Sequence, residues 1–184
     1  MKINKKLLTI IVTLLATVGF LAVDHNTTHA QSIYSAKYWG ASRKVTIPQK
    51  LRGSWYFVND ANELTKIKFT THMFNKATIY KFLSEKEESK YFNKYNKLSI
   101  HKQRSILDYF TNYALSGIVF TWHNKTGINL HAWLIGEGGG AQYVPVTRNI
   151  NGKKVKAIRI GGGAYNSLNG YAYKTKSLAI KRRK

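Results

Sequence analysis

The sequence predicts a mainly β (α+β) fold, an antiparallel barrel or sandwich of about eight strands with a helical insertion near residues 84–114. Three observations support this prediction. Short apolar segments alternate with turn signals rich in Gly and Asn, one capping-box sequence followed by helical periodicity lies in the middle of the chain, and strands and helices do not alternate as βαβ units. Closing the sheet would leave few exposed edges.

The chain is expected to contain a leader, a lead-in segment and one domain. Residues 1–30 are typical of a secretory signal peptide, with three lysines before the apolar run Leu7–Val23 and small residues near Ala30. We expect cleavage after Ala30 and a secreted, envelope-associated protein; retention of the segment as a membrane anchor is the alternative. Residues 31–49 would form the lead-in, and residues 50–184 a single barrel-like domain with a basic tail.

The net charge is unusually high for one domain. The chain has 30 Lys and Arg against 8 Asp and Glu. Residues 1–30 contain three Lys and one Asp, so 30 − 3 = 27 basic and 8 − 1 = 7 acidic residues remain, a formal charge of about +20. No acidic residue follows Glu137. The sequence has no cysteine, which excludes a disulfide framework and a lipid-modified cysteine.

The basic tail is the predicted polyanion-binding segment. Its residues are Lys174, Lys176, Lys181, Arg182, Arg183 and Lys184. A field of this kind attracts polyanions, and the expected partners are anionic cell-wall polymers or an anionic lipid surface, with no specific nucleic acid. The alternative is an ordinary solvated face.

The first half of the domain is expected to be a meander of strands. An edge strand near Lys44–Ile47 stops at a proline, and Leu51–Val58 forms the next strand. Turn residues follow, then a strand at Leu64–Thr70 whose apolar side chains share one face, and another at Lys76–Leu83.

The run Gly53-Ser54-Trp55-Tyr56 resembles the first-strand G-x-W signature of lipocalins and lipocalin-like (calycin) barrels. The chain also resembles the small basic secreted proteins of lactobacilli and relatives. The lipocalin resemblance implies that Trp55 closes one end of a barrel and packs against an arginine near the last strand, Arg182 first and Arg159 second. The chain differs from that pattern because its helix lies in the middle rather than after the last strand.

Two helices are expected between the early strands and the central hairpin. Ser84-Glu85-Lys86-Glu87 fits a capping box, and asparagines at 93 and 96 are expected to shorten the helix that it begins. A second helix should begin near Ser99 and end at Ser116–Gly117, with one apolar stripe.

The segment Gly117–Gly136 is the expected central hairpin, with its turn within Asn124–Gly127. Pairing Asn124 with Gly127, or His123 with Ile128, gives one register. One face then collects Ile118, Phe120, Trp122, Asn129, His131, Trp133 and Ile135. Both faces are largely apolar, which predicts a core on one side and a helix on the other.

A second hairpin is predicted at Gln142–Ile150 and Lys153–Ile160, because Asn151-Gly152 is a strong type I′ turn signal. Pairing Ile150 with Lys153 brings two glycine runs, 138–140 and 161–163, to one end of the sheet. The face that carries Tyr143, Thr147, Asn149, Lys154 and Lys156 is expected to be the wetter one. One or two further strands should follow within Leu168–Ile180.

The candidate ligand-binding residues are aromatic and polar side chains of the central hairpin, together with the signature tryptophan. They are Trp55, Phe120, Trp122, Asn129, His131 and Trp133. Aromatic walls with a few polar groups suit a small apolar or sugar-like ligand; ordinary core packing is the alternative. The histidines show no metal-ligand spacing, so the sequence predicts neither a metal nor a cofactor.

The function that these features favour is that of an exported, cationic, non-enzymatic binding protein retained electrostatically at the bacterial cell envelope. A secreted lipocalin-like carrier is one alternative. A secreted ribonuclease or phosphodiesterase is another, with Glu137 as its base, His131 as its acid and either Arg148 or Arg159 as its phosphate-binding group. A cationic antimicrobial or adhesin is a third.

Overall fold

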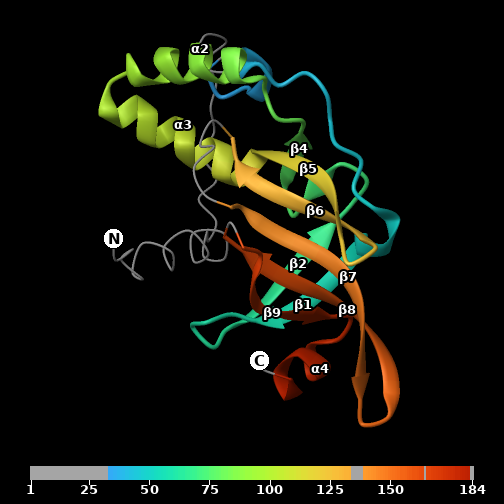
Figure 1. Ribbon diagram of the computed structural model, residues 1–184. Coiled ribbons are helices and arrows are strands. Elements are labelled where there is room, and N and C mark those ends of the chain that lie inside the picture. The colour runs from blue at the N-terminus through green and yellow to red at the C-terminus, as the bar shows by residue number, and fades with distance from the viewer. Residues whose placement is uncertain (1–32, 134–138, 164, 183–184) are drawn as a thin grey trace.

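The computed structural model describes residues 33–133, 139–163 and 165–182. Nine strands form one sheet that closes into a ring in chain order, and two helices are inserted mid-chain (Figure 1). The predicted mainly β fold is therefore confirmed, with nine strands rather than about eight. The predicted signal segment 1–30, Glu137, Arg183 and Lys184 lie outside the described residues.

The strands are β1 Gly53–Val58, β2 Leu64–Phe69, β3 Met73–Phe74, β4 Ala77–Tyr80, β5 Ala114–Trp122, β6 Lys125–Ala132, β7 Ala141–Ile150, β8 Lys153–Gly162 and β9 Ser167–Tyr173. The helices are α2 Glu85–Asn96, α3 Ile100–Tyr113 and α4 Lys176–Lys181, with short 3₁₀ turns at Ala36–Trp39 and Gln49–Leu51. The ring is not a regular barrel, because β3 has two residues and β1 meets β9 at one residue pair, Tyr56 with Tyr173.

The predicted capping box starts α2. The Ser84 hydroxyl oxygen accepts a hydrogen bond from the Glu87 amide, and the Glu87 carboxylate accepts one from the Ser84 amide at 3.0 Å. Of the two asparagines expected to shorten the helix, Asn93 lies within α2 and Asn96 is its last residue. Helix α3 ends at Tyr113, three residues before the expected end.

The two-helix insertion changes the strand direction expected after β4. Strand β5 pairs with β4 in parallel, with Thr78 opposite Ala114 and Tyr80 opposite Ser116. The prediction of an entirely antiparallel sheet was therefore wrong at this position. The two helices form a long crossover that returns the chain to the end of the sheet from which β4 began, so β5 runs parallel to β4.

The central hairpin turns earlier than its sequence suggested. His123 and Asn124 are the two turn residues, with φ of 44° and 59°, and Trp122 pairs with Lys125. The predicted turn within 124–127 was therefore wrong, and the observed pairing is shifted by an even number of residues. Side chains alternate with a period of two, so an even shift leaves the predicted division between the two faces unchanged.

The second hairpin has the predicted register. Ile150 pairs with Lys153 around Asn151-Gly152, whose φ values are 50° and 76°. The two glycine runs meet, since Ala141 pairs with Gly162. The prediction about its wetter face was wrong near the ring, because Tyr143 on that face is buried in the main core; Lys154 and Lys156 at the tip are exposed as expected.

The last segment contains one strand and a helix that the sequence analysis did not predict. Strand β9 runs through Asn169-Gly170, with a bulge opposite Ile160 and Gly161. The Thr175 hydroxyl then caps α4 by accepting from the Leu178 amide at 3.3 Å. The residues expected to form a second late strand are therefore helical.

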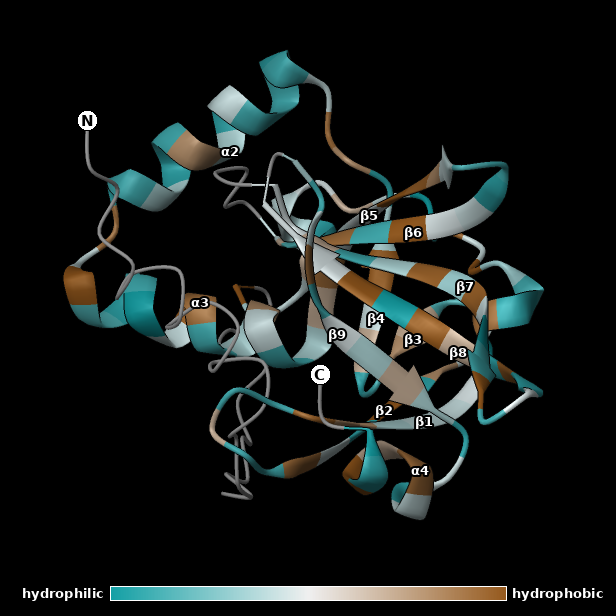
Figure 2. Cartoon of the chain, turned by 60° about the horizontal axis from the view of Figure 1, so that its bottom comes forward, coloured by the Kyte–Doolittle hydropathy of each residue, from teal (hydrophilic) through white to brown (hydrophobic). Residues whose placement is uncertain are grey.

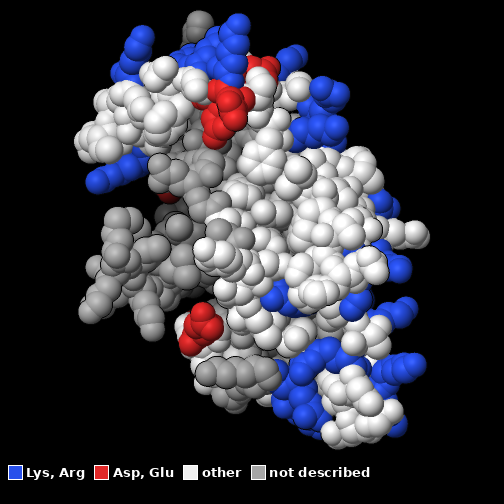
Figure 3. All heavy atoms as spheres, in the orientation of Figure 1, with Lys and Arg blue, Asp and Glu red and all other residues white. Residues whose placement is uncertain are grey.

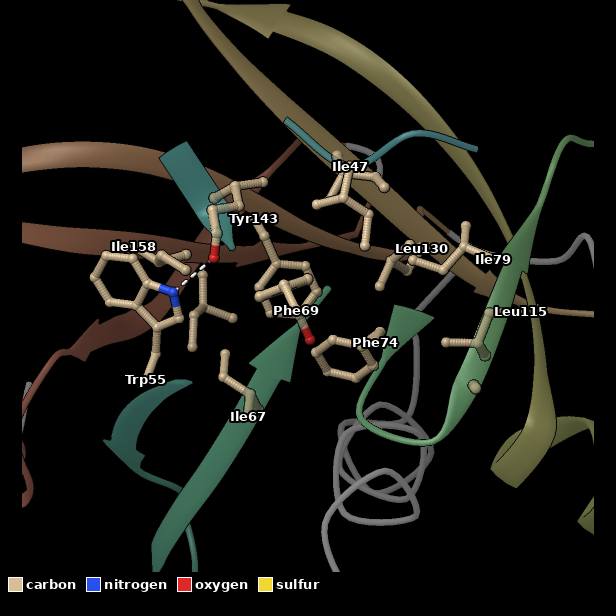
Figure 4. Close-up of a cluster of buried hydrophobic side chains, with 14 of the residues drawn as sticks. Ile47, Trp55, Ile67, Phe69, Phe74, Ile79, Leu115, Leu130, Tyr143 and Ile158 are labelled. Carbon is tan, nitrogen blue, oxygen red and sulfur yellow. Dashed lines mark hydrogen bonds between the residues drawn. The ribbon is translucent and has the colours of Figure 1, made fainter. Parts of the chain in front are cut away.

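The ring encloses the main core. Its buried side chains come from most of the strands and include Trp55, Ile67, Phe69, Phe74, Ile79, Leu115, Leu130, Tyr143 and Ile158 (Figure 4). The Trp55 indole N–H donates to the Leu51 carbonyl at 2.6 Å. The lead-in segment adds Ile47, and its backbone bonds to the sheet at Val45 and Ile47. This packing makes the lead-in part of the same core.

Two smaller clusters lie outside the ring. Trp39, Phe110 of α3 and Trp133 pack together in one of them. Helices α2 and α3 lie at the end of the molecule away from α4 (Figures 1 and 2). Against α4, Ala179 packs with Ala157 and Tyr173. The helices therefore cover the outer face of the ring in two places.

The position of Trp55 gives a stability prediction. Replacing Trp55 with Ala should lower the free energy of unfolding by on the order of 3–5 kcal/mol, because a large buried ring is lost from the core. Denaturant unfolding followed by circular dichroism would measure it. Tyr165→Ala is the control, since that side chain is 94% exposed and its loss should change stability by less than about 0.5 kcal/mol. Equal effects of the two substitutions would contradict a core role for Trp55.

Candidate functional site

The structure brings four of the six predicted ligand-binding residues onto one surface. Phe120, Trp122, Asn129 and His131 lie on the outer face of β5 and β6, because their neighbours Ile128 and Leu130 point into the ring. The other two are elsewhere: Trp55 is in the ring core, and Trp133 packs in the cluster under the helices. The four outer residues are thus not placed to line a barrel mouth.

The cation on Trp55 differs from the one that the lipocalin resemblance implied. Lys174, directly after β9, places its ammonium nitrogen 3.6 Å from the centroid of the Trp55 ring. The same ammonium group donates to the Arg52 carbonyl at 3.3 Å. Arg182 instead donates to the Asn151 side chain at 2.9 Å, and Arg159 lies on the outer face. The expected arginine partner was therefore wrong.

A polar row crosses the outer face from β6 to β8. Gln142 pairs with Asn129 on one side and with Gly161 on the other. Its side-chain amide donates to the Gly163 carbonyl at 3.3 Å, while the Asn129 amide donates to Gly139 at 3.0 Å. These bonds join the two glycine segments. Gln142 is 9% exposed and was not identified from the sequence.

Arg159 lies beside this row and is also buried, at 8% exposure. Its two terminal nitrogens donate to the side-chain oxygen and to the backbone carbonyl of Asn166, both at 2.6 Å. Its guanidinium carbon is 4.6 Å from the centroid of the Trp122 ring. Asn166 was not identified from the sequence, because its contact with Arg159 depends on the β8–β9 turn. The sequence signal that could have indicated this turn is the pair Gly163 and Asn166, two residue types typical of turns; the Asn166 amide donates to the Gly163 carbonyl.

His131 is half-buried at the edge of the same face. Its ring lies edge-on to Phe82 with 5.0 Å between centroids. Burial lowers the pKa of His131 below its ordinary value, because the protonated ring loses hydration there. The neutral form is therefore favoured in the folded protein. Its proposed catalytic partner Glu137 lies outside the described residues.

Exposed cations gather at the α4 end of the molecule. Lys153, Lys154 and Lys156 come from the β7–β8 hairpin, and Lys174, Lys176 and Lys181 come from the end of β9 and from α4. We call these six residues the cationic end. Figure 3 shows the lysines and arginines grouped around α4 and this hairpin. The predicted tail residues therefore share this end of the molecule with lysines of the β7–β8 hairpin, a separate segment of the chain.

Acidic side chains of the β1–β2 turn lie at the same end of the molecule, to one side of the cationic end (Figure 3). The other acidic residues that the structure describes occur in α2 and α3, and the last of them is Asp108. The pKa of Lys174 is below its ordinary value, first because of burial and second because of the charge of Lys156. Lysines of the two segments therefore lie close enough to repel one another.

Within residues 33–133, 139–163 and 165–182, no three His, Asp or Glu side chains are grouped so that they could hold a metal ion. In the same part of the chain, no helix has the length and apolar character needed to cross a membrane. Comparison with family models, with curated proteins and with solved structures found no match.

The environment of His131 predicts a pH dependence of stability. Below the pKa of the unfolded state, the unfolded chain binds a proton at His131 that the folded chain resists, so stability should fall as the pH drops from 7.5 toward 5.5. His131→Gln should reduce this loss, measured by denaturant unfolding across that pH range. His101→Gln, at an exposed position of α3, is the control. An unchanged pH slope in His131→Gln would contradict the assignment.

Proposed function

We propose that this is an exported, non-enzymatic binding protein that its cationic end attaches to anionic polymers of the bacterial cell envelope. The observation that supports it most directly is the gathering of six exposed lysines from two separate segments at one end of the molecule. Export itself rests on the signal-like segment 1–30 of the sequence.

The distribution of charge favours adhesion over general solubility. The acidic residues of α2, Glu85, Glu87 and Glu88, lie at the other end of the molecule among its lysines, so charges of both signs mix there. At the cationic end lysines predominate, and the acidic side chains of the β1–β2 turn lie to one side of them (Figure 3). A local field of one sign attracts a polyanion and orients the protein on it, whereas a mixed surface does neither to the same extent.

A lipocalin-like carrier receives less support from the structure. A carrier needs space inside its ring, and the centre of this ring is occupied by Phe69, Phe74 and Tyr143. Their ring centroids are 5.0–5.3 Å apart, which is direct aromatic packing. We therefore place binding on the exterior of the ring.

Electrostatic attachment predicts release by salt. Protein bound to isolated bacterial cell walls at about 0.1 M NaCl, where the Debye length is about 10 Å, should elute near 1 M, where it is about 3 Å. Sedimentation of the walls at increasing salt would measure the midpoint of release. Walls stripped of their phosphate-containing polymers should retain much less protein. Retention of most of the protein at 1 M would exclude electrostatic attachment.

A pair of matched variants locates the binding surface. Lys153→Gln, Lys176→Gln and Lys181→Gln together remove three exposed charges from the cationic end. The control, Lys86→Gln, Lys90→Gln and Lys97→Gln, removes three exposed charges from the region of α2. We expect the first triple variant to be released at clearly lower salt than the second. Equal midpoints would mean that total charge, and not the cationic end, causes attachment.

A further inference from the structure

Within the part of the chain that the structure describes, Arg159 is a buried cation without a counter-charge. It is 8% exposed, and its hydrogen bonds go to Asn166 alone, which is neutral. No carboxylate contacts it among the residues that the structure describes, and the face of its guanidinium group lies against Trp122. A charge taken out of water without an opposite charge is unfavourable, so the position favours an anion that completes it.

The hydrogen bonds of Arg159 leave one edge of its guanidinium group open. Asn166 accepts at the end of the group, through one N–H of each terminal nitrogen. The N–H of Nε and the second N–H of Nη2 form the side edge, and no partner for them occurs in the described part of the chain. That edge matches two oxygens of a carboxylate or phosphate.

Two more buried polar atoms at this place have no hydrogen-bond partner among the described residues. They are the side-chain nitrogen of Asn166 and the side-chain oxygen of Asn129. Asn129 and Gly161, over which Asn166 lies, flank Gln142 in one row across three strands, so they are about 10 Å apart. An unused donor and an unused acceptor at this spacing suit hydroxyl groups, which both donate and accept.

Glycines make room for these side chains. A Cβ added to Gly161 would lie 2.5 Å from Nη1 of Arg159 and would overlap the Asn166 side chain. A Cβ added to Gly140 would overlap the side chains of Asn129 and His131. The polar groups therefore sit where a larger residue would exclude them.

We propose that Trp122, Asn129, Arg159 and Asn166 bind an oxyanion, a carboxylate or a phosphate, that belongs to a hydroxylated sugar or polyol unit. We call these four residues the Arg159 site. Arg159 binds the oxyanion through its side edge, Asn166 adds a donor, and Asn129 accepts from a hydroxyl group. The Arg159 site shares no residue with the cationic end, and its binding does not require attachment to the envelope.

The test is a titration of the full protein followed by NMR at the indole N–H of Trp122, assigned with Trp122→Phe. The probes are glucuronate and glycerol 3-phosphate, with glucose and glycerol as their neutral counterparts. About 0.5 M NaCl screens the general field of the protein. We expect the anions to shift the Trp122 signal and the neutral compounds to leave it nearly unchanged. The anion with the lower dissociation constant identifies a carboxylate or a phosphate as the preferred group.

Variants separate the Arg159 site from charge alone. Arg159→Lys keeps the charge and removes the planar edge, so it should weaken binding about tenfold or more. Asn166→Ala should also weaken binding and serves if Arg159→Lys does not fold. Lys176→Gln, on α4, should leave the dissociation constant within about twofold. The proposal is overturned if neither anion shifts the Trp122 signal, if the neutral compounds act equally, or if Lys176→Gln weakens binding as much as Arg159→Lys.

Discussion

The space inside the ring is the constraint on which the structure depends. A closed sheet of nine strands encloses a volume that inward side chains must fill at the density of a protein interior. Here β3 has two residues and β4 has four, the aromatic rings of Phe69, Phe74 and Tyr143 meet at the centre, and Trp55 is buried in the same core. With the interior filled, the surfaces available to a partner are the outer face of the sheet and the helices on it.

Local patterns predicted much of this architecture. The type I′ turn at Asn151-Gly152 determines the β7–β8 register by itself, because its two positive φ values suit Asn and Gly. The central hairpin lacks such a dipeptide. Its turn forms at His123-Asn124, so the predicted pairing was shifted although the division into faces was right. The parallel β4–β5 pair could not be predicted from short segments, since it depends on where two helices return the chain.

For the site too, contacts within one hairpin could be predicted from the sequence, and contacts between separate segments could not. Trp122, Asn129 and His131 were predicted to share a face, and they do, because this follows from alternation along one hairpin. Arg159 and Gln142 join them only when β7 and β8 lie beside β6, and Asn166 only when the β8–β9 turn folds over Gly161. The cation that contacts Trp55 is a similar case. Lys174 follows β9 directly and lies over the Trp55 ring, whereas Arg182 follows α4 and donates to Asn151 instead.

The seam of the ring has a consequence for how the chain folds. Strands β5 to β8 form hairpins between neighbours in sequence, whereas β1 and β9 join the two ends of the domain at Tyr56 and Tyr173. The entropy lost on closing a loop grows with the length of chain enclosed, so the seam is the pairing least favoured by entropy. Ala179 and Leu178 of α4 pack over both tyrosines. Helix α4, which carries two of the six lysines of the cationic end, thus also stabilises the pairing that closes the sheet.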